Sequence, residues 1–255
     1  MLLAIDIGNT NVTIGIFDGN KIRATCRLST HVSQMPDEYA VFILSLLRHR
    51  GIDTENIKEG AISCVVPPLL TTFNELFKKY FDITPLNVGP GVKTGIRIRM
   101  DNPREVGSDR IANAAGAHSL YKGPVIVVAL GTATAFDTVS KEGDYLGGAV
   151  APGIAIAAEA LYTRTAALPR VELVRPKKAI GTNTVAAMQS GIIFGYAGLI
   201  DGIVTRIQKE LGEKATVVAT GGYASVIARE AKVIDKVNPD LTLIGIRVIH
   251  DINRE

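Results

Sequence analysis

Two short turns, each beginning with glycine at the end of an apolar run, carry residue types that suit phosphate groups. The first is Gly8-Asn9-Thr10-Asn11, after residues 2–7, and the second is Gly131-Thr132-Ala133-Thr134, after residues 125–130. A glycine turn leaves backbone N–H groups without a side chain in the way, and such a nest suits phosphate oxygens. Either turn alone is also what an ordinary hairpin needs. Their repetition at matching places raises the alternative that two nests hold one polyphosphate chain.

Two aspartates complete the candidate chemistry. Asp6 precedes the first turn, where its carboxylate could hold Mg²⁺ directly or through water, because hard dications prefer oxygen ligands. Asp109 stands beside Arg110, in the segment of residues 101–110. A carboxylate can accept a hydroxyl proton while a guanidinium holds an anionic substrate. The other interpretation of the same pair is a helix N-terminus with an acid in its first turn and a salt bridge, and composition alone favours it.

The elements that must position these residues follow an α/β pattern that occurs twice. Overlaying Gly8 on Gly131 aligns residues 3–8 with residues 126–131 and places Ala129 on Asp6, which indicates a duplicated domain. A small-residue helix is expected at residues 111–120, between the two halves, and residues 233–249 are expected to form closing strands or a helix at the edge of the fold. The periodicity predicts strands at residues 2–7, 12–17, 21–28, 61–66, 125–130, 135–139, from 145, and 215–219, and helices at residues 36–50, 69–80, 154–162, 184–211 and 224–230.

Composition excludes several classes of protein. The 255 residues are 47% hydrophobic and 21% charged, which is typical of folded domains and not of disordered chains. A net charge of +3 is too small to indicate a nucleic-acid-binding surface by itself. Residues 179–200 carry no formal charge and are long enough to span a membrane, but their polar residues and glycines favour a buried helix. No Walker, GxGxxG, HExxH or GxSxG motif occurs, which disfavours P-loop enzymes, dehydrogenases, zincins and α/β-hydrolases.

Taken together, the motifs resemble the type III pantothenate kinases of the acetate and sugar kinase/Hsp70/actin superfamily, over essentially the whole chain. The resemblance rests on several ordered segments: residues 6–11, 37–39, 65–68, 101–110, 131–134, 147–153, 181–184 and 220–222. It implies an α/β fold of duplicated ribonuclease H-like (actin-like ATPase) lobes with a central cleft. We expect the N-terminal lobe at residues 1–118 and the C-terminal lobe at residues 119–255.

The resemblance also implies a function. It is the ATP-dependent phosphorylation of pantothenate to 4′-phosphopantothenate, the first step of coenzyme A biosynthesis, by a cytoplasmic homodimer that uses Mg²⁺ and a monovalent cation (K⁺ or NH₄⁺) and has no nucleic-acid or membrane partner. Asp109 would be the catalytic base, and Asp6 would hold Mg²⁺. Thr184 would reach the substrate across the dimer interface. The residues implied for ATP are Asp6, Ile7, Gly8, Asn9, Thr10, Asn11, Val12, Thr13, Thr132, Gly221 and Gly222, and those implied for pantothenate are Met100, Gly107, Ser108, Asp109, Arg110 and Thr184.

Two positions depart from the family pattern. Ala129 replaces the aspartate that family members usually carry before the second turn and that is associated with the monovalent cation. Met100 replaces a tyrosine that is expected to touch pantothenate in many members. These departures raise an alternative function, a catalytically weakened or inactive paralogue that binds a nucleotide or pantothenate as a regulator. We expect an active enzyme, because the residues implied for the reaction are all present: Asp6, Asp109, Arg110, Thr132 and Thr184.

Overall fold

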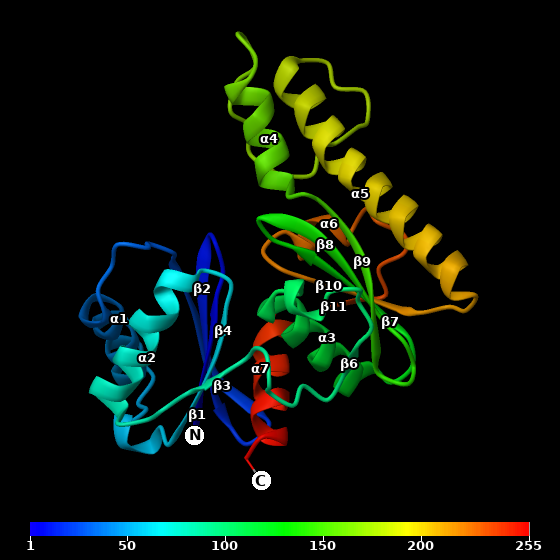
Figure 1. Ribbon diagram of the computed structural model, residues 1–255. Coiled ribbons are helices and arrows are strands. Elements are labelled where there is room, and N and C mark those ends of the chain that lie inside the picture. Colours follow the sequence, from blue (N-terminus) through cyan, green and yellow to red (C-terminus); the bar gives the residue numbers. More distant parts are fainter. Residues whose placement is uncertain (255) are drawn as a thin grey trace. The chain divides into compact units, whose positions relative to one another are not determined.

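The computed structural model describes residues 1–254, which form two compact units (Figure 1). Of the described residues, unit 1 comprises 1–96, 101–119 and 241–254, and unit 2 comprises 97–100 and 120–240. These units differ from the expected lobes at two places. The C-terminal segment from Leu241 belongs to unit 1, and the four residues Arg97–Met100 belong to unit 2.

Unit 1 is built on a five-stranded sheet in the order β3-β2-β1-β4-β5. The β1–β2–β3 meander is antiparallel, whereas β4 runs parallel to both β1 and β5. Its strands are β1 (Leu2–Ile7), β2 (Asn11–Asp18), β3 (Lys21–Ser29), β4 (Glu59–Cys64) and β5 (Leu86–Asn87), and its helices are α1 (Pro36–His49), η1 (Thr54–Asn56), α2 (Pro67–Phe81), η2 (Pro103–Glu105), α3 (Ser108–Tyr121) and α7 (Leu241–Ile252).

The alternation of side chains along β1 assigns its two faces. Leu3, Ile5 and Ile7 pack with α1 and α2 in one core cluster. Successive side chains of a strand point to opposite faces, so Asp6 lies on the other face. That face is covered by α7, whose Leu243 would collide with a Cβ added at Gly15 of β2. The face with Asp6 is therefore the one on which α7, rather than α1 and α2, packs.

The helices α3 and α7 approach each other backbone to backbone in unit 1. A Cβ added at Gly245 of α7 would lie 1.8 Å from the carbonyl oxygen of Ala112, and one at Gly116 of α3 would lie 2.9 Å from the carbonyl oxygen of Leu241. The hydroxyl of Thr242 also donates to Oδ1 of Asn113 at 2.7 Å. Helix α7 thereby packs closely against α3, whose first turn contains the predicted catalytic residue Asp109.

Unit 2 is built on a six-stranded sheet in the order β11-β10-β7-β8-β9-β6. Ile126, Val128 and Leu130 of β7 share a core cluster with Ile193 and Ile200 of α5. Its elements are β6 (Arg97–Ile98), β7 (Val125–Leu130), β8 (Ala133–Val139), β9 (Asp144–Pro152), α4 (Ile154–Thr163), α5 (Thr184–Leu211), β10 (Thr216–Thr220), α6 (Ala224–Ile227) and β11 (Lys236–Val237).

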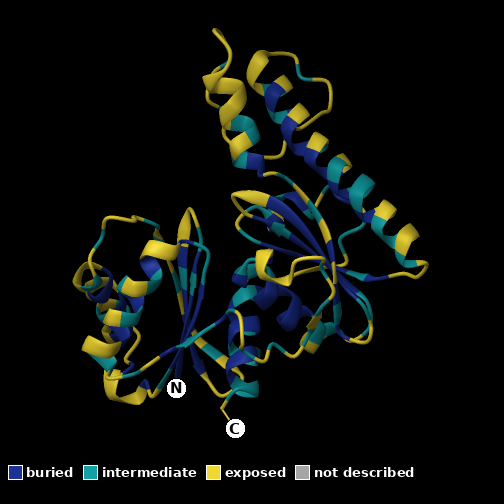
Figure 2. Ribbon diagram, viewed as in Figure 1, coloured by how far each residue is buried: buried dark blue, intermediate teal, exposed yellow. Residues whose placement is uncertain are grey.

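Helix α5 is long and apolar enough to cross a membrane by length and composition, and 44% of its most apolar window is buried within the protein. Core helices of soluble proteins pass the same test. Figure 2 shows buried and exposed residues alternating along α5, and the buried ones include Ile193, Ile200 and Val204, which belong to the unit 2 core. The sequence analysis predicts a buried helix here, and α5 packs into the unit 2 core through these residues.

The predicted elements differ from the structure mainly at helix boundaries and short strands. Helix α3 begins at Ser108 instead of residue 111, so Asp109 and Arg110 lie in its first turn. Helix α6 ends at Ile227 rather than at residue 230. The strands β5 and β6 have only two residues each and carry no periodic signal. Residues 233–249 contribute both a short strand and most of a helix, and that helix packs in unit 1 because its apolar face covers β1, β2 and β4.

Candidate active site

The first turn closes on itself through backbone hydrogen bonds. The Gly8 N–H donates to the carbonyl of Asn11 at 3.0 Å, and the hydroxyl of Thr30 donates to the carbonyl of Gly8 at 2.7 Å. A Cβ at Gly8 would lie 3.1 Å from the Asn11 carbonyl oxygen, so a larger residue at this position would crowd the turn. The Gly8 amide is therefore used within the turn. The exposed residues Asn9, Thr10 and Asn11 are the ones from which a nest for phosphate would have to be built.

Asp6 lies in a row of polar residues that crosses three strands. In register it faces Thr13 of β2 on one side and Ser63 of β4 on the other. Residues directly opposite each other in neighbouring strands point to the same face. The side chains of Ile7 and Val12 are fully buried in the opposite core, so any contact they make with a nucleotide would come from the backbone.

Hydroxyl groups join the Asp6 row to the start of α3. The buried Ser63 hydroxyl donates to Oδ1 of Asp6 at 2.9 Å and lies 3.2 Å from the hydroxyl of Ser108. Ser108 in turn accepts from the Cys64 N–H at 2.9 Å and donates to the Cys64 carbonyl at 3.1 Å. The first residue of α3 is thus attached to the end of β4, one strand away from Asp6.

Asp109 follows Ser108 and lies close enough to Asp6 for their charges to interact. Its Oδ1 accepts from the Arg110 N–H at 2.8 Å, and a Cβ at Gly107 would lie 2.6 Å from the same oxygen. A side chain at position 107 would therefore displace this carboxylate from its present position. Sequence interpretation left open whether Asp109 and Arg110 form a site or only a helix terminus. The structure places them at a helix terminus that also adjoins the Asp6 row.

The electrostatics of this carboxylate pair are unfavourable in the free protein. Burial, together with the negative charge of Asp109, raises the pKa of Asp6 to about 7 from an ordinary value of 3.8, against the lowering effect of the Ser63 hydroxyl. Burial also raises the pKa of Asp109, although the backbone N–H and the charge of Arg110 oppose that shift. Two partly desolvated carboxylates that repel each other are what a cation or a transferable proton would stabilise.

Sequence interpretation missed Ser63. The signal that could have found it is its place near the C-terminal end of a buried strand that pairs in parallel with β1. Polar residues at that end of neighbouring parallel strands meet at one edge of a sheet and line ligand sites there. The strand pairing of Ser63 with Asp6 is a tertiary fact, however, and could not be read from their spacing of 57 positions.

In unit 2, the second turn and the β10–α6 turn lie against each other. The Gly131 N–H donates to the Ala133 carbonyl at 3.0 Å, and the Thr132 carbonyl accepts from the Gly153 N–H at 3.1 Å. Gly221 has a φ of +96°, and a Cβ there would lie 2.5 Å from the carbonyl oxygen of Leu130. Both the left-handed conformation and this close approach require glycine. The predicted nucleotide residues Thr132, Gly221 and Gly222 therefore belong to adjoining turns.

The remaining predicted residues also belong to unit 2. Ala129 pairs with Ala135 of β8 and with Thr220 of β10. Thr184 is exposed at the first position of α5, after the cap Asn183, whose side chain accepts from the Ala186 N–H at 2.9 Å. It contributes to a cavity of about 780 Å³ between α4 and the N-terminal half of α5.

Met100 is the last residue of the short segment 97–100, which belongs to unit 2 although the residues before and after it belong to unit 1. A Cβ added at Gly147, which has a φ of +100°, would lie 2.8 Å from the Met100 sulfur. The structure thus brings the predicted residues together in two groups, one around Asp6 and Asp109 and the other around Thr132 and Gly221, while Met100 and Thr184 lie elsewhere in unit 2.

The residues around Asp6 fit a divalent cation with few protein ligands. Among residues 1–254, no group of three or more His, Cys, Asp or Glu side chains is arranged to hold a metal. Mg²⁺ commonly takes one or two carboxylates and completes its shell with water and substrate phosphates. Asp6 and Asp109 are two neighbouring carboxylates whose negative charges repel each other, so they could supply the one or two protein ligands that Mg²⁺ commonly takes. Ala129 does not fit a cation ligand, because its methyl group has no oxygen.

Comparison with known proteins agrees with this geometry. The family model described as type III pantothenate kinase matches residues 2–206. A curated relative from Dehalococcoides mccartyi, named type III pantothenate kinase, is 56% identical over 253 residues, which are 99% of this chain and 98% of the relative.

Solved structures show the same fold at low identity. A Baf family protein from Campylobacter jejuni matches with a TM-score of 0.61 at 19% identity, over 98% of each chain. The ROK hexokinase from Thermus thermophilus matches with a TM-score of 0.50 at 12% identity, over 97% of each chain. The duplicated α/β architecture of actin-like ATPases and sugar kinases is thereby confirmed. With a family model that covers most of the sequence and a full-length relative at 56% identity, this chain belongs to the type III pantothenate kinase family.

Proposed function

We propose that this enzyme transfers the γ-phosphoryl group of ATP to the terminal hydroxyl of pantothenate, giving ADP and 4′-phosphopantothenate, the first step of coenzyme A biosynthesis. Membership of the kinase family supports this reaction. The structural observation that carries it is the interacting pair Asp6 and Asp109, in which the Ser63 hydroxyl donates to Asp6 and also lies within hydrogen-bond distance of the Ser108 hydroxyl at the start of α3. None of the comparisons supports the alternative of an inactive binding paralogue.

Asp109 is proposed as the base that accepts the hydroxyl proton of pantothenate as the new P–O bond forms and ADP leaves. Its pKa is raised by burial, which brings the carboxylate closer to the range in which a general base works best near neutral pH. Arg110 would hold an anionic part of the substrate. Because the Ser108 hydroxyl is bonded to Cys64, we propose that Ser108 and Gly107 act through their backbone and through the placement of α3.

ATP is proposed to lie on the glycine turns. In unit 1 the segment from Asp6 to Thr13 would supply the first phosphate loop, and in unit 2 Thr132 would contact ATP while Gly221 and Gly222 would lie near the adenosine. When bound, Mg²⁺ would neutralise phosphate charge, and Asp6 is the residue proposed to hold it. Phosphoryl transfer depends mainly on positioning and charge neutralisation, so no covalent role for the protein is needed.

The monovalent cation that the family resemblance implies receives no side-chain ligand from Ala129. We propose that K⁺ or NH₄⁺ stimulates this enzyme weakly. We further propose a cytoplasmic homodimer without nucleic-acid or membrane partners, in which Thr184 reaches pantothenate across the dimer interface. The exposure of Thr184 and of the neighbouring apolar Ile180 and Val185 supports that placement.

The proposed reaction is tested by a coupled ADP-release assay with pantothenate and a short panel of other hydroxylated acids. We expect turnover with pantothenate that exceeds turnover with every other acid in the panel. ATP binding without ADP production would overturn the proposal in favour of a binding protein. Preferred turnover of another acid would instead assign a different acceptor, with Met100 as the first position to examine.

A further inference from the structure

The chain leaves unit 1 for only four residues before it returns with the proposed catalytic segment. Arg97–Met100 belong to unit 2, whereas the residues before and after them, up to Ile96 and from Asp101, belong to unit 1. Within these four residues, β6 pairs with β9 over two positions, Arg97 with Asp144 and Ile98 with Tyr145. Two backbone bonds flank this pairing, from the Arg97 N–H to the Gly143 carbonyl at 2.8 Å and from the Arg99 N–H to the Tyr145 carbonyl at 2.9 Å.

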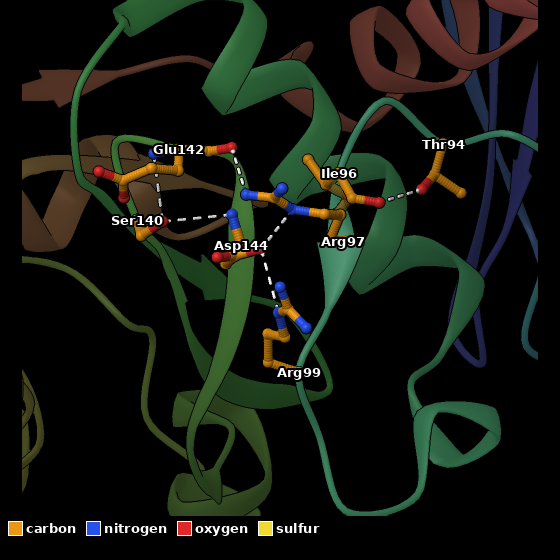
Figure 3. A network of polar contacts seen from close by, with 7 residues as sticks. All are labelled: Thr94, Ile96, Arg97, Arg99, Ser140, Glu142 and Asp144. Carbon is orange, nitrogen blue, oxygen red and sulfur yellow. Dashed lines mark hydrogen bonds and ion pairs between the residues drawn. The ribbon is translucent and has the colours of Figure 1, made fainter.

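Such a short edge strand has little backbone pairing of its own, and an ionic cluster reinforces it. Figure 3 shows the Asp144 carboxylate between the guanidinium groups of Arg97 and Arg99. The Asp144 Oδ1 lies 2.6 Å from Nε of Arg97 and 3.2 Å from Nε of Arg99. Arg97 also donates to the carbonyl of Glu142 at 3.2 Å. Residues two apart in a strand share a face, so one carboxylate can hold both arginines.

The backbone of Asp144 is itself held by a hydrogen-bonded turn. The Ser140 hydroxyl accepts from the N–H groups of Glu142 and Asp144 at 3.2 Å each, and the Ser140 N–H donates to the Asp144 carbonyl at 2.8 Å. The Asp144 side chain is 19% exposed, whereas its two partners are 59% and 58% exposed. Asp144 is therefore the fixed and more buried member of the cluster, and the arginines are the members that it orders.

What the cluster holds leads directly to residues of the proposed site. Met100 follows Arg99, and its sulfur lies against Gly147 of β9, the strand with which β6 pairs. Nine residues after Met100 comes Asp109. An edge strand that detaches from β9 would release Met100 from Gly147 and would free the start of the segment that enters α3.

We infer that Asp144, with Arg97 and Arg99, is a positioning cluster that anchors the segment of residues 97–110 and so sets the binding of the phosphoryl acceptor. The inference rests on the proposed function for its kinetic consequence. Asp144 acts through Met100 and the following segment and is not a catalytic residue. Removal of its charge leaves two neighbouring guanidinium groups without their shared partner, which opposes the β6–β9 pairing.

The test compares Asp144→Asn with Glu230→Gln, a matched control in the same unit. Glu230 pairs with Arg175, its side chain is 13% exposed, and its partner is 54% exposed, so the control removes a similar ion pair. We expect Asp144→Asn to raise the KM for pantothenate about fivefold or more, with kcat and the KM for ATP within about twofold of wild type. Glu230→Gln should leave all three constants within about twofold, and Asp144→Glu should restore much of the acceptor affinity.

Hydrogen exchange of the backbone amides separates this inference from the proposed function. We expect amides of residues 97–100 and 108–110 to exchange at least about threefold faster in Asp144→Asn than in Glu230→Gln. Unchanged exchange there would overturn the anchoring role, and faster exchange with an unchanged KM for pantothenate would overturn the link to acceptor binding. A wild-type enzyme that does not phosphorylate pantothenate would refute the proposed function, while the exchange comparison would still decide whether Asp144 anchors the segment.

Discussion

The β1–β2 turn of unit 1 and the β7–β8 turn of unit 2 share a scaffold but differ in charge. Strands β1 and β7 are both six residues long and have the same burial pattern, in which only the fifth residue is partly exposed. That residue is Asp6 in unit 1 and Ala129 in unit 2. The parallel neighbour in register with it is Ser63 in the first case and Thr220 in the second. The duplicated fold thus repeats the position and not the side chain.

The two turns differ in the kind of local structure around them. Unit 1 has two interacting carboxylates, and the Ser63 hydroxyl donates to one of them, Asp6. Unit 2 supplies close backbone packing, with Gly153 and Gly221 admitting the carbonyls of Thr132 and Leu130 at distances that no side chain would allow. A charged position costs stability when it is partly desolvated, so it is kept where proton or metal chemistry needs it.

The largest effect is expected from Asp109→Asn. An amide cannot accept the hydroxyl proton, so kcat should fall by about 10²–10⁴-fold, the scale of general acid–base catalysis. Steady-state kinetics with saturating ATP and pantothenate measure it. Asp53→Asn, an exposed carboxylate of the same unit, serves as control and should keep wild-type kcat. A wild-type rate in Asp109→Asn would show that the base has been assigned to the wrong residue.

Asp6→Asn should lower kcat by roughly 10²-fold, because the charge proposed to hold Mg²⁺ is lost. The same change should stabilise the ligand-free protein. The raised pKa of Asp6, about 7, means that the folded protein binds this proton more tightly than the unfolded chain does. Wild-type stability from this group is therefore fully present only below the ordinary pKa of 3.8, and it is lost progressively as pH rises from there through about 7.

The asparagine variant should accordingly exceed wild type in free energy of unfolding by about 1–3 kcal/mol at pH 8 and by less than half of that at pH 5, because the unfolded chain already loses this proton above its ordinary pKa of 3.8. Urea denaturation at the two pH values, without nucleotide or Mg²⁺, measures the difference. An equal advantage at both values would mean that Asp6 does not titrate with a raised pKa.

A smaller effect is expected from Ser63→Ala, which removes the hydroxyl that donates to Asp6. Loss of one such bond to a charged group costs about 1–2 kcal/mol, so kcat should fall by about fivefold to thirtyfold. The corresponding change in unit 2, Thr220→Ser, keeps a hydroxyl beside the uncharged Ala129 and should alter kcat less than about twofold. If both variants behaved alike, the contrast between the two turns would not hold.

The smallest effect is expected from Ala129→Asp, which gives unit 2 the charge that unit 1 has. A carboxylate at this partly exposed strand position supplies an oxygen ligand, so K⁺ should stimulate turnover about twofold to fivefold more than in wild type. Rates in K⁺ and in a salt of a large organic cation at equal ionic strength measure the response. An identical response in wild type and variant would remove the cation role from this position.

Much of the architecture could be predicted from local patterns. The strand at residues 2–7, the strand at residues 125–130 and the long helix at residues 184–211 were predicted with the boundaries that the structure has. Each has a continuous apolar run or a clear cap, because its own residues decide its ends. The early start of α3 could not be predicted, since Ser108 begins the helix by bonding to Cys64, which is 44 positions away.

Local chemistry along the chain decided which residue types stand before and after each glycine turn, and hence that Asp6 and Asp109 are candidates while Ala129 is not. Only the tertiary structure determines which residues contact these side chains. In the folded protein, Ser63 pairs with Asp6, helix α7 packs in unit 1, and Arg97–Met100 belong to unit 2. Strand periodicity depends on neighbours two residues apart, whereas these contacts join segments separated by tens to hundreds of positions, and their energy arises only once the chain has been brought together.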